Sequence, residues 1–221
     1  MKEERFLHLI RQKTFLLSFL TGLVFLAGSF VVNYFAASYA TSRASDSVTD
    51  IVLSNTRVYD VDAIFVFGAL FMVAVIAVVC FYKPRSAPFT VKSIALFIFI
   101  RAIFISLTHI RAFPVRALID YNFLNASTFW NGIFTGNDLF FSGHTGLPFL
   151  MALIWWKNRF LRTLFLMFSL LFGVVVLLGH LHYTIDVLSA FFITFSIWSI
   201  AKVFFKKDWK FFLNDNPSLI D

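Results

Sequence analysis

The chain has 221 residues, of which 59% are hydrophobic and only 14% charged, a composition that excludes an ordinary soluble domain. Its net charge of +7 would suit a nucleic-acid-binding protein, but the basic residues are dispersed at the ends of apolar runs, which indicates membrane topology instead. The single cysteine, Cys80, lies inside an apolar run and excludes an intrachain disulfide. We therefore expect an all-α integral membrane protein with one domain, residues 1–221.

Six apolar runs follow one another along the chain. The first, at about residues 15–37, has a core of roughly twenty residues, which is long enough to span a bilayer and too long for a typical signal peptide. We expect it to remain uncleaved, although residues 38–40 resemble a cleavage site. The other transmembrane helices are expected at about residues 61–82, 91–110, 145–156, 161–178 and 185–205. The run at 145–156 is short and can begin within the turn that precedes it.

The positions of the basic residues predict the orientation. Fourteen of the 19 Lys and Arg residues lie in the N-terminal segment, in the loops 83–92 and 157–162, and in residues 202–210. The positive-inside rule makes that side cytosolic, so both termini are expected in the cytosol. The long polar loops 41–60 and 111–141 then lie on the exoplasmic side. Loops of this length are usually functional or disordered.

Two short segments carry ionisable residues that are costly to place near a bilayer. The first is Phe141-Ser142-Gly143-His144-Thr145, and the second is the stretch from Gly179 to Val187, which contains His180, His182 and Asp186. If the residues from 183 to 186 begin a helix, His182 and Asp186 stand one above the other on one face. The carboxylate then accepts a hydrogen bond from one ring nitrogen and leaves the other nitrogen to attack a substrate. The predicted topology brings both segments to the exoplasmic face.

The pairing of Ser142-Gly143-His144 with His182-x-x-x-Asp186 resembles the type-2 phosphatidic acid phosphatase (lipid phosphate phosphatase) superfamily. The fuller pattern, Ser-Gly-His-Thr followed by His-x-His-Tyr-Thr-x-Asp-Val, is similar to the sphingomyelin synthase branch, as is Arg101 followed seven residues later by Thr108. The resemblance covers roughly residues 100–200. The first two apolar runs agree only in being apolar runs.

The resemblance implies a phosphohistidine mechanism. His182, oriented by Asp186, attacks the phosphorus atom, and His144 protonates the leaving oxygen. Water or a lipid hydroxyl then discharges the intermediate. Cationic side chains and backbone N–H groups can neutralise the phosphate, so no metal and no other cofactor is required.

Two departures from the phosphatases bear on the substrate. Val176 stands where they carry an Arg six residues before the attacking His, and their Lys-x6-Arg-Pro motif has no counterpart. A dianionic phosphomonoester would lose cations by these changes, whereas a phosphodiester with one negative charge needs fewer. We therefore expect transfer of a phospholipid headgroup to a lipid hydroxyl such as ceramide or diacylglycerol. Hydrolysis of phosphatidic acid-type or isoprenoid phosphates is the alternative, in which Arg101, Arg111 or Arg116 would supply the missing charge.

Six residues around the triad are expected to contact the substrate: Arg101, Asp138, Ser142, Gly143, His180 and Tyr183. For three of them a structural role competes. Arg101 either binds phosphate or snorkels out of its span. Asp138 either orients His144 or caps the turn, and His180 either supports the site or is merely interfacial.

Two other classes of protein stay open at this point. A haem or metal protein would use His144, His180 and His182 as ligands, but that interpretation leaves Asp186 and the Ser142-Gly143 pair unexplained. A membrane scaffold without catalytic activity would need none of these residues. The expected partners are therefore the membrane and phospholipid and lipid-alcohol substrates, and no nucleic acid.

Overall fold

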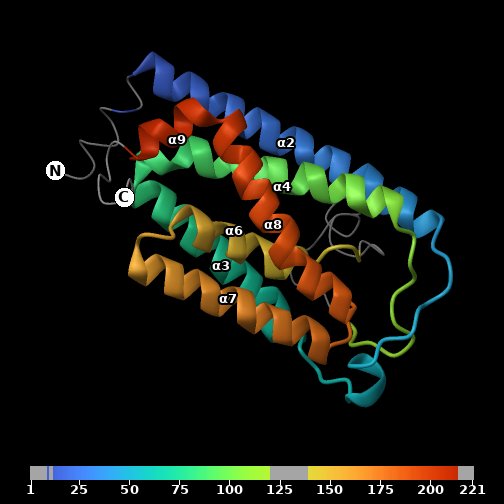
Figure 1. Cartoon of the computed structure of the whole chain (residues 1–221). Coiled ribbons are helices and arrows are strands. Elements are labelled where there is room, and N and C mark those ends of the chain that lie inside the picture. Colours follow the sequence, from blue (N-terminus) through green and yellow to red (C-terminus); the bar gives the residue numbers. More distant parts are fainter. Residues whose placement is uncertain (1–8, 10–11, 120–138, 214–221) are drawn as a thin grey trace.

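The computed structural model describes residue 9 and residues 12–119 and 139–213, and within them every regular element is a helix (Figure 1). Five of the helices are long and apolar enough to cross a membrane. They are α2 (Lys13–Ser42), α3 (Asp62–Tyr82), α4 (Ala87–Leu107), α7 (Arg159–Leu178) and α8 (Thr184–Phe204). The shorter elements are η1 (Leu53–Asn55), η2 (Pro84–Ser86), α6 (Gly143–Ile154) and α9 (Lys206–Leu213). The prediction of an all-α protein is confirmed for the described residues.

Five of the six predicted apolar runs are long helices whose ends lie within a few residues of the expected ones. The sixth, predicted at 145–156, is α6, which begins at Gly143 and has 12 residues. At 1.5 Å per residue such a helix is about 18 Å long, well short of a hydrocarbon core of about 30 Å. The structure therefore shows five helices that can span and one that is too short alone, and the six-span topology remains a proposal.

The helices form a bundle in which α6 is enclosed (Figure 1). Helix α2 runs along α4, while α6 packs against α7 and α8. The close approach of α6 to its neighbours depends on Gly146, where a Cβ atom would lie 2.8 Å from both Phe97 Cε2 and Thr194 Oγ1. Small residues at helix crossings allow this contact in membrane proteins.

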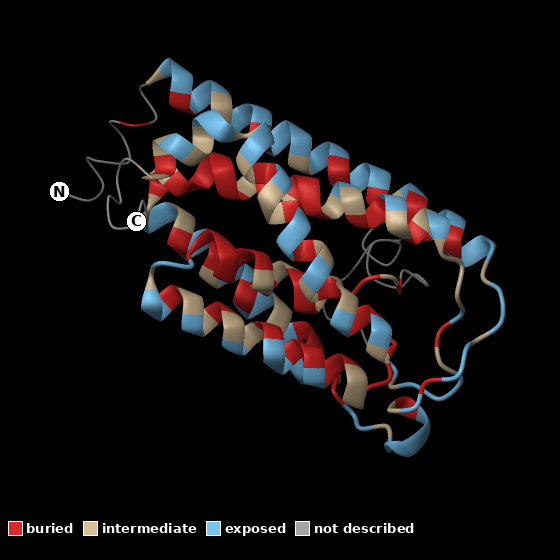
Figure 2. Ribbon diagram, in the orientation of Figure 1, coloured by how far each residue is buried: buried red, intermediate tan, exposed pale blue. Residues whose placement is uncertain are grey.

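Large apolar side chains lie on both the inside and the outside of the bundle. Trp155, Phe89, Phe141, Phe165 and Phe172 are fully buried and form the centre of the main core. Exposed residues cover the outward faces of the long helices (Figure 2), and many of these are large and apolar: Val24, Phe35, Phe71, Met167, Phe192 and Val203. So many exposed apolar side chains indicate that the outside of the bundle faces lipid.

One end of the bundle is tied together by contacts between α2, α4 and α9. The ammonium of Lys92 lies 2.7 Å from Asp208 Oδ2 and donates to Ser18 Oγ, also at 2.7 Å. The rings of Phe89 and Trp209 are 4.8 Å apart at the same end. The loops 43–61 and 108–119 and the turn before α8 lie at the opposite end (Figure 1). The bundle thus separates its two ends as the charge pattern predicts, and which end faces the cytosol stays a prediction.

Candidate active site

Ser142 caps α6 and joins the two motifs. Its side-chain oxygen accepts the backbone N–H of Thr145 at 3.3 Å and the Thr145 hydroxyl at 3.1 Å, which is the ordinary role of a serine at a helix N-terminus. Its own backbone N–H donates to the carbonyl of Asp186 at 3.1 Å. Because Ser142 is fully buried, this bond fixes the Ser-Gly-His turn directly against the first turn of α8.

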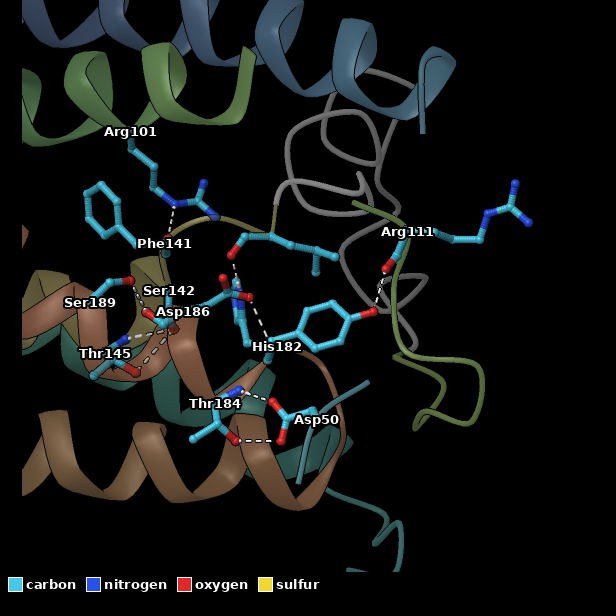
Figure 3. A network of polar contacts seen from close by, with 12 residues as sticks. Asp50, Arg101, Arg111, Phe141, Ser142, Thr145, His182, Thr184, Asp186 and Ser189 are labelled. Carbon is cyan, nitrogen blue, oxygen red and sulfur yellow. Dashed lines mark hydrogen bonds and ion pairs between the residues drawn. The ribbon is translucent and has the colours of Figure 1, made fainter. Parts of the chain in front are cut away.

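Arg101 reaches from α4 to the same turn (Figure 3). Its Nε donates to the carbonyl of Phe141 at 2.8 Å, and the side chain is buried. A Cβ atom at position 143 would lie 3.3 Å from Nε and 3.6 Å from Cζ of Arg101. Gly143 therefore leaves room for the guanidinium to lie against the backbone of the turn that carries His144.

His182 lies just before α8, with one side of its ring held by two oxygen atoms. Its Nδ1 donates to the carbonyl of Leu139 at 2.8 Å and lies 3.4 Å from Asp186 Oδ2. Both acceptors favour the proton on Nδ1, which leaves the lone pair on Nε2. Asp186 Oδ2 also accepts the backbone N–H of Tyr183 at 3.0 Å. The carboxylate thus both orients the imidazole and caps the helix.

This arrangement corrects one detail of the sequence-based prediction. The helix starts at Thr184, so His182 stands outside it, and the short hydrogen bond of its Nδ1 goes to Leu139 rather than to Asp186. The sequence had no signal for Leu139, because the group that acts is a backbone carbonyl.

His144 lies in the first turn of α6, between aromatic rings from two other helices. Its ring centroid is 4.1 Å from that of Phe65 on α3 and 5.9 Å from that of Phe172 on α7. His144 directly follows Gly143, against which the Arg101 side chain lies, and Ser142 bonds the same turn to the first turn of the helix that His182 precedes. The fold therefore brings the two histidines and the arginine, from three different parts of the chain, to the same end of the bundle.

Asp50, in the loop after α2, is a residue that sequence reasoning did not single out. Its Oδ2 accepts the backbone N–H of Thr184 at 2.7 Å, and its Oδ1 accepts the Thr184 hydroxyl at 2.8 Å (Figure 3). Oδ1 also accepts the N–H groups of Val52 and Leu53, at 2.9 and 3.1 Å. Burial opposes ionisation, but these hydrogen bonds outweigh it and hold the pKa of the Asp50 carboxyl below its usual value. Its negative charge suits the start of α8, where the helix dipole is positive.

His180 is engaged on both sides of its ring. Nδ1 lies 3.0 Å from the carbonyl of Val115, to which it donates, and Nε2 accepts from the hydroxyl of Thr56 at 3.2 Å. The ring of Phe113 packs edge-on against it, and only 3% of the residue is exposed. Through these contacts His180 links the loops 43–61 and 108–119. They do not support the predicted contact with substrate.

Tyr183 is also held by protein groups. Its hydroxyl donates to the carbonyl of Arg111 at 2.8 Å and accepts the N–H of Val48 at 3.2 Å. Burial raises the pKa of this hydroxyl, and the nearby carboxylates of Asp186 and Asp50 act in the same direction. Tyr183 therefore stays a neutral hydrogen-bonding link between the two loops. The remaining predicted substrate contact, Asp138, lies outside the described residues.

With this geometry in place, the chain can be compared with known proteins. Residues 135–203 match the family model described as PAP2 superfamily C-terminal. No curated protein and no solved structure matches the chain. The matched segment contains both motifs, α6, α7 and nearly all of α8, and leaves out the helices α2, α3 and α4. The match supports the type-2 phosphatidic acid phosphatase superfamily and, in general, a membrane enzyme that acts on lipid phosphates.

Within the PAP2-like segment, the position that lacks the phosphatase arginine is completely apolar. Val176 is fully buried and packs in a cluster that includes Val61, Phe65 and Val187. Of the described residues, Arg101 is the guanidinium that contacts the Ser-Gly-His turn.

A metal ion held by His144, His180 and His182 has no geometric support in the described residues. They contain no group of three or more His, Cys, Asp or Glu side chains that could hold a metal ion. His180, one of the three ligands that this alternative needs, has both ring nitrogens on Val115 and Thr56.

Proposed function

We propose that the protein is a membrane lipid phosphotransferase that moves a phospholipid headgroup to a lipid hydroxyl, in the manner of a sphingomyelin synthase, through a phosphohistidine on His182. The observation that carries the proposal is the arrangement of His182: Nδ1 faces Leu139 and Asp186, and Nε2 is left as the nucleophile. The bond between Ser142 and Asp186 holds the turn with His144 against this group.

The first half of the reaction forms a phosphorus–nitrogen bond. The lone pair of His182 Nε2 attacks the phosphorus of a phosphodiester, and the bond from phosphorus to the diacylglycerol oxygen breaks. The imidazolium of His144 gives its proton to that oxygen, so diacylglycerol leaves as a neutral alcohol. The Leu139 carbonyl accepts a hydrogen bond from Nδ1 of His182, and the Asp186 carboxylate lies beside the same atom. Both groups therefore stabilise the positive charge that develops on the ring.

The second half reverses these roles. The hydroxyl oxygen of the acceptor lipid attacks the phosphorus of the phosphohistidine, and its proton passes to the neutral His144. The phosphorus–nitrogen bond breaks, His182 regains its lone pair, and the new phosphodiester leaves. Both histidines return to their starting protonation states, and no atom changes its oxidation state in the cycle.

The charge available near the turn favours a diester. Among the described residues, Arg101 is the buried guanidinium that contacts the turn, and the apolar Val176 stands where a second would be expected in a phosphatase. A monoanionic phosphodiester can be balanced by one such cation, whereas a dianionic monoester would keep one charge without a partner.

We place this reaction on the exoplasmic face. The site lies at the end of the bundle formed by the loops 43–61 and 108–119, and the basic segments that the structure describes, 83–92, 157–162 and 202–210, lie toward the other end (Figure 1). The positive-inside rule supports this orientation.

The test is headgroup transfer by the purified protein. The protein is incubated in mixed micelles with a phospholipid labelled in its headgroup, with and without ceramide, and in the presence of a chelator. We expect a labelled product lipid that appears only with an acceptor and is absent with His182→Ala. Efficient release of inorganic phosphate from phosphatidic acid, without any transfer, would overturn the proposal.

Hydrolysis of a lipid phosphate is the second candidate. It is favoured by the match of residues 135–203 to the PAP2 superfamily model, and it uses the same two histidines with water in place of the lipid hydroxyl. The transfer assay distinguishes the two reactions, because hydrolysis leaves no label in an acceptor lipid.

A further inference from the structure

A basic groove lies at the elbow between α8 and α9, at the opposite end of the bundle from the histidines. It has a volume of about 510 Å³ and is lined by Lys202, Val203, Lys206, Trp209, Lys210 and Leu213. Lys202 in the last turn of α8 follows His182 by 20 residues, which corresponds to about 30 Å of helix. The groove is therefore not part of the catalytic site.

The charge in this groove is strongly one-sided. Three of the residues that line it are lysines, and within the described part of the chain no carboxylate does so. Asp208, the acidic residue of α9, is turned to the bundle, where it forms an ion pair with Lys92 at 2.7 Å and accepts from Ser18. Lys206 and Lys210 are both exposed and stand four residues apart, on the same face of α9.

The apolar contacts of α9 fix the direction in which these lysines point. Trp209 packs on Phe89 with a centroid distance of 4.8 Å, and Phe212 packs on Trp155, also at 4.8 Å. The helix is thus held to the bundle by its aromatic face and presents Lys206 and Lys210 on the outside. Lys202 lies over the ring of Trp198, 3.2 Å from its centroid, at the end of the apolar span.

The groove also stands at the level where a lipid headgroup would be found. Val203 and Phe204, in the last turn of α8, are 70% and 71% exposed, as expected for a lipid-facing surface. The first lysine of α9, Lys206, follows Phe204 by two residues. Lysine side chains at the ends of spans extend to the interface in this way.

We propose that this groove binds the phosphate of an anionic phospholipid of the leaflet at the α9 end of the bundle. The lysines at 202, 206 and 210 would surround the phosphate, and the apolar side chains of Val203 and Leu213 would contact the start of the acyl chains. Attraction of Lys to an anionic membrane surface supplies the selectivity over zwitterionic lipids. The bound lipid would hold α9, and through it the contacts with Lys92 and Ser18, in place.

Lipid binding to the full chain in detergent tests this directly. Native mass spectrometry measures the apparent Kd for phosphatidylglycerol and for phosphatidylcholine. We expect the protein to bind phosphatidylglycerol more tightly, and Lys206→Gln/Lys210→Gln to weaken that binding by at least about fivefold, the contribution expected of a single surface lysine. Lys206→Arg/Lys210→Arg should retain the affinity, because it keeps both charges.

The matched control is Lys157→Gln/Lys207→Gln, which removes the same charge from two exposed lysines that do not line the groove. It should leave the affinity for phosphatidylglycerol within twofold of the wild type. The proposal is overturned by equal affinity for the two lipids, by an equal loss in the control pair, or by unchanged binding in the Gln variant at positions 206 and 210. Complete competition by inorganic phosphate at the same concentration would show a site for a soluble anion and would also overturn it.

Discussion

The backbone N–H of Ser142 donates to the carbonyl of Asp186 at 3.1 Å, so two motifs more than forty residues apart share a direct hydrogen bond. Neither group belongs to a reactive side chain. Its effect is positional: it fixes the start of α6, with His144, against the start of α8, with His182 just before it. Because this bond holds both histidines at one end of the bundle, we expect them to act as one unit.

The first prediction separates the histidines of the site from the other histidines. His182→Ala and His144→Ala should each abolish turnover, because one loses the nucleophile and the other the proton donor. Asp186→Asn should leave a small residual rate, since the carbonyl of Leu139 still holds Nδ1 of the imidazole. Trapping of an acid-labile phosphoprotein with labelled phospholipid provides the measurement.

The control for this series is His109→Gln. The ring of His109 bonds the carbonyl of Ser106 and packs on Tyr39, outside the proposed site, so the variant should retain labelling and turnover. Phosphate trapping that survives His182→Ala would remove the nucleophile assignment.

The second prediction concerns the carboxylate that holds the start of α8. Asp50→Asn should lower the free energy of unfolding by about 1–3 kcal/mol near pH 7, because it weakens several hydrogen bonds to one buried, charged acceptor. The pKa of Asp50 is lower in the folded protein than its usual value of 3.8, so its contribution is fully present above that value and is lost as pH falls through the folded pKa. The difference between wild type and variant should therefore shrink below about pH 4.

Unfolding in detergent, followed by circular dichroism at several pH values, checks this. Asp46→Asn, an exposed carboxylate in the same loop, should change stability by less than about 0.5 kcal/mol. A difference between Asp50→Asn and wild type that stays constant from pH 7 to pH 3 would contradict the assignment of the effect to the ionised carboxylate.

Much of the architecture could be predicted because it follows from apolar length and charge. Five long helices have the expected positions, and Ser142, a common N-cap residue, begins α6 as the Ser-Gly-His turn suggested. The groups that hold the site in place could not be predicted from the sequence. The Leu139 carbonyl that binds His182 has no side-chain signal, and Asp50 reaches Thr184 across 134 residues of sequence. His180 and Tyr183 stand beside the motif in sequence, yet their side chains are engaged by loop residues.

The third prediction concerns the close contact between Arg101 and the backbone of Gly143. Gly143→Ala places a methyl group 3.3 Å from Arg101 Nε, so the guanidinium must move or lose its bond to the Phe141 carbonyl. We expect the transfer rate to fall by about tenfold, equivalent to about 1.4 kcal/mol, with a much smaller change in stability. The control is Gly28→Ala, where the added methyl group meets nothing within 4 Å and should leave the rate unchanged. Equal rates for both variants would show that the position of Arg101 does not matter.

The fourth prediction is topological. In a Cys80→Ala background, Ser54→Cys in the loop after α2 should react with a membrane-impermeant thiol reagent added outside intact cells. Lys157→Cys, in the turn between α6 and α7, should react only after the membrane is opened. Both positions are exposed in the structure, so a failure to react reflects the membrane rather than burial. External labelling at 157 would reverse the proposed orientation.

The last prediction separates a diester from a monoester substrate. Arg101 is the guanidinium that contacts the Ser-Gly-His turn, and Val176 is fully buried among apolar side chains. A dianionic monoester would therefore carry one charge without a partner, and in a buried site this costs more than the difference of about 1.4 kcal/mol that changes a rate tenfold. We expect kcat/KM for a phosphodiester lipid to exceed that for phosphatidic acid by at least tenfold.

Arg101→Ala should reduce both values. Arg101→Lys should retain only part of the activity, because an ammonium cannot reproduce the bond from Nε together with a second contact to phosphate. If phosphatidic acid is the better substrate for the wild type, the enzyme is a lipid phosphate phosphatase. The second cation that balances the dianionic phosphate must then come from elsewhere in the chain, because position 176 is a valine.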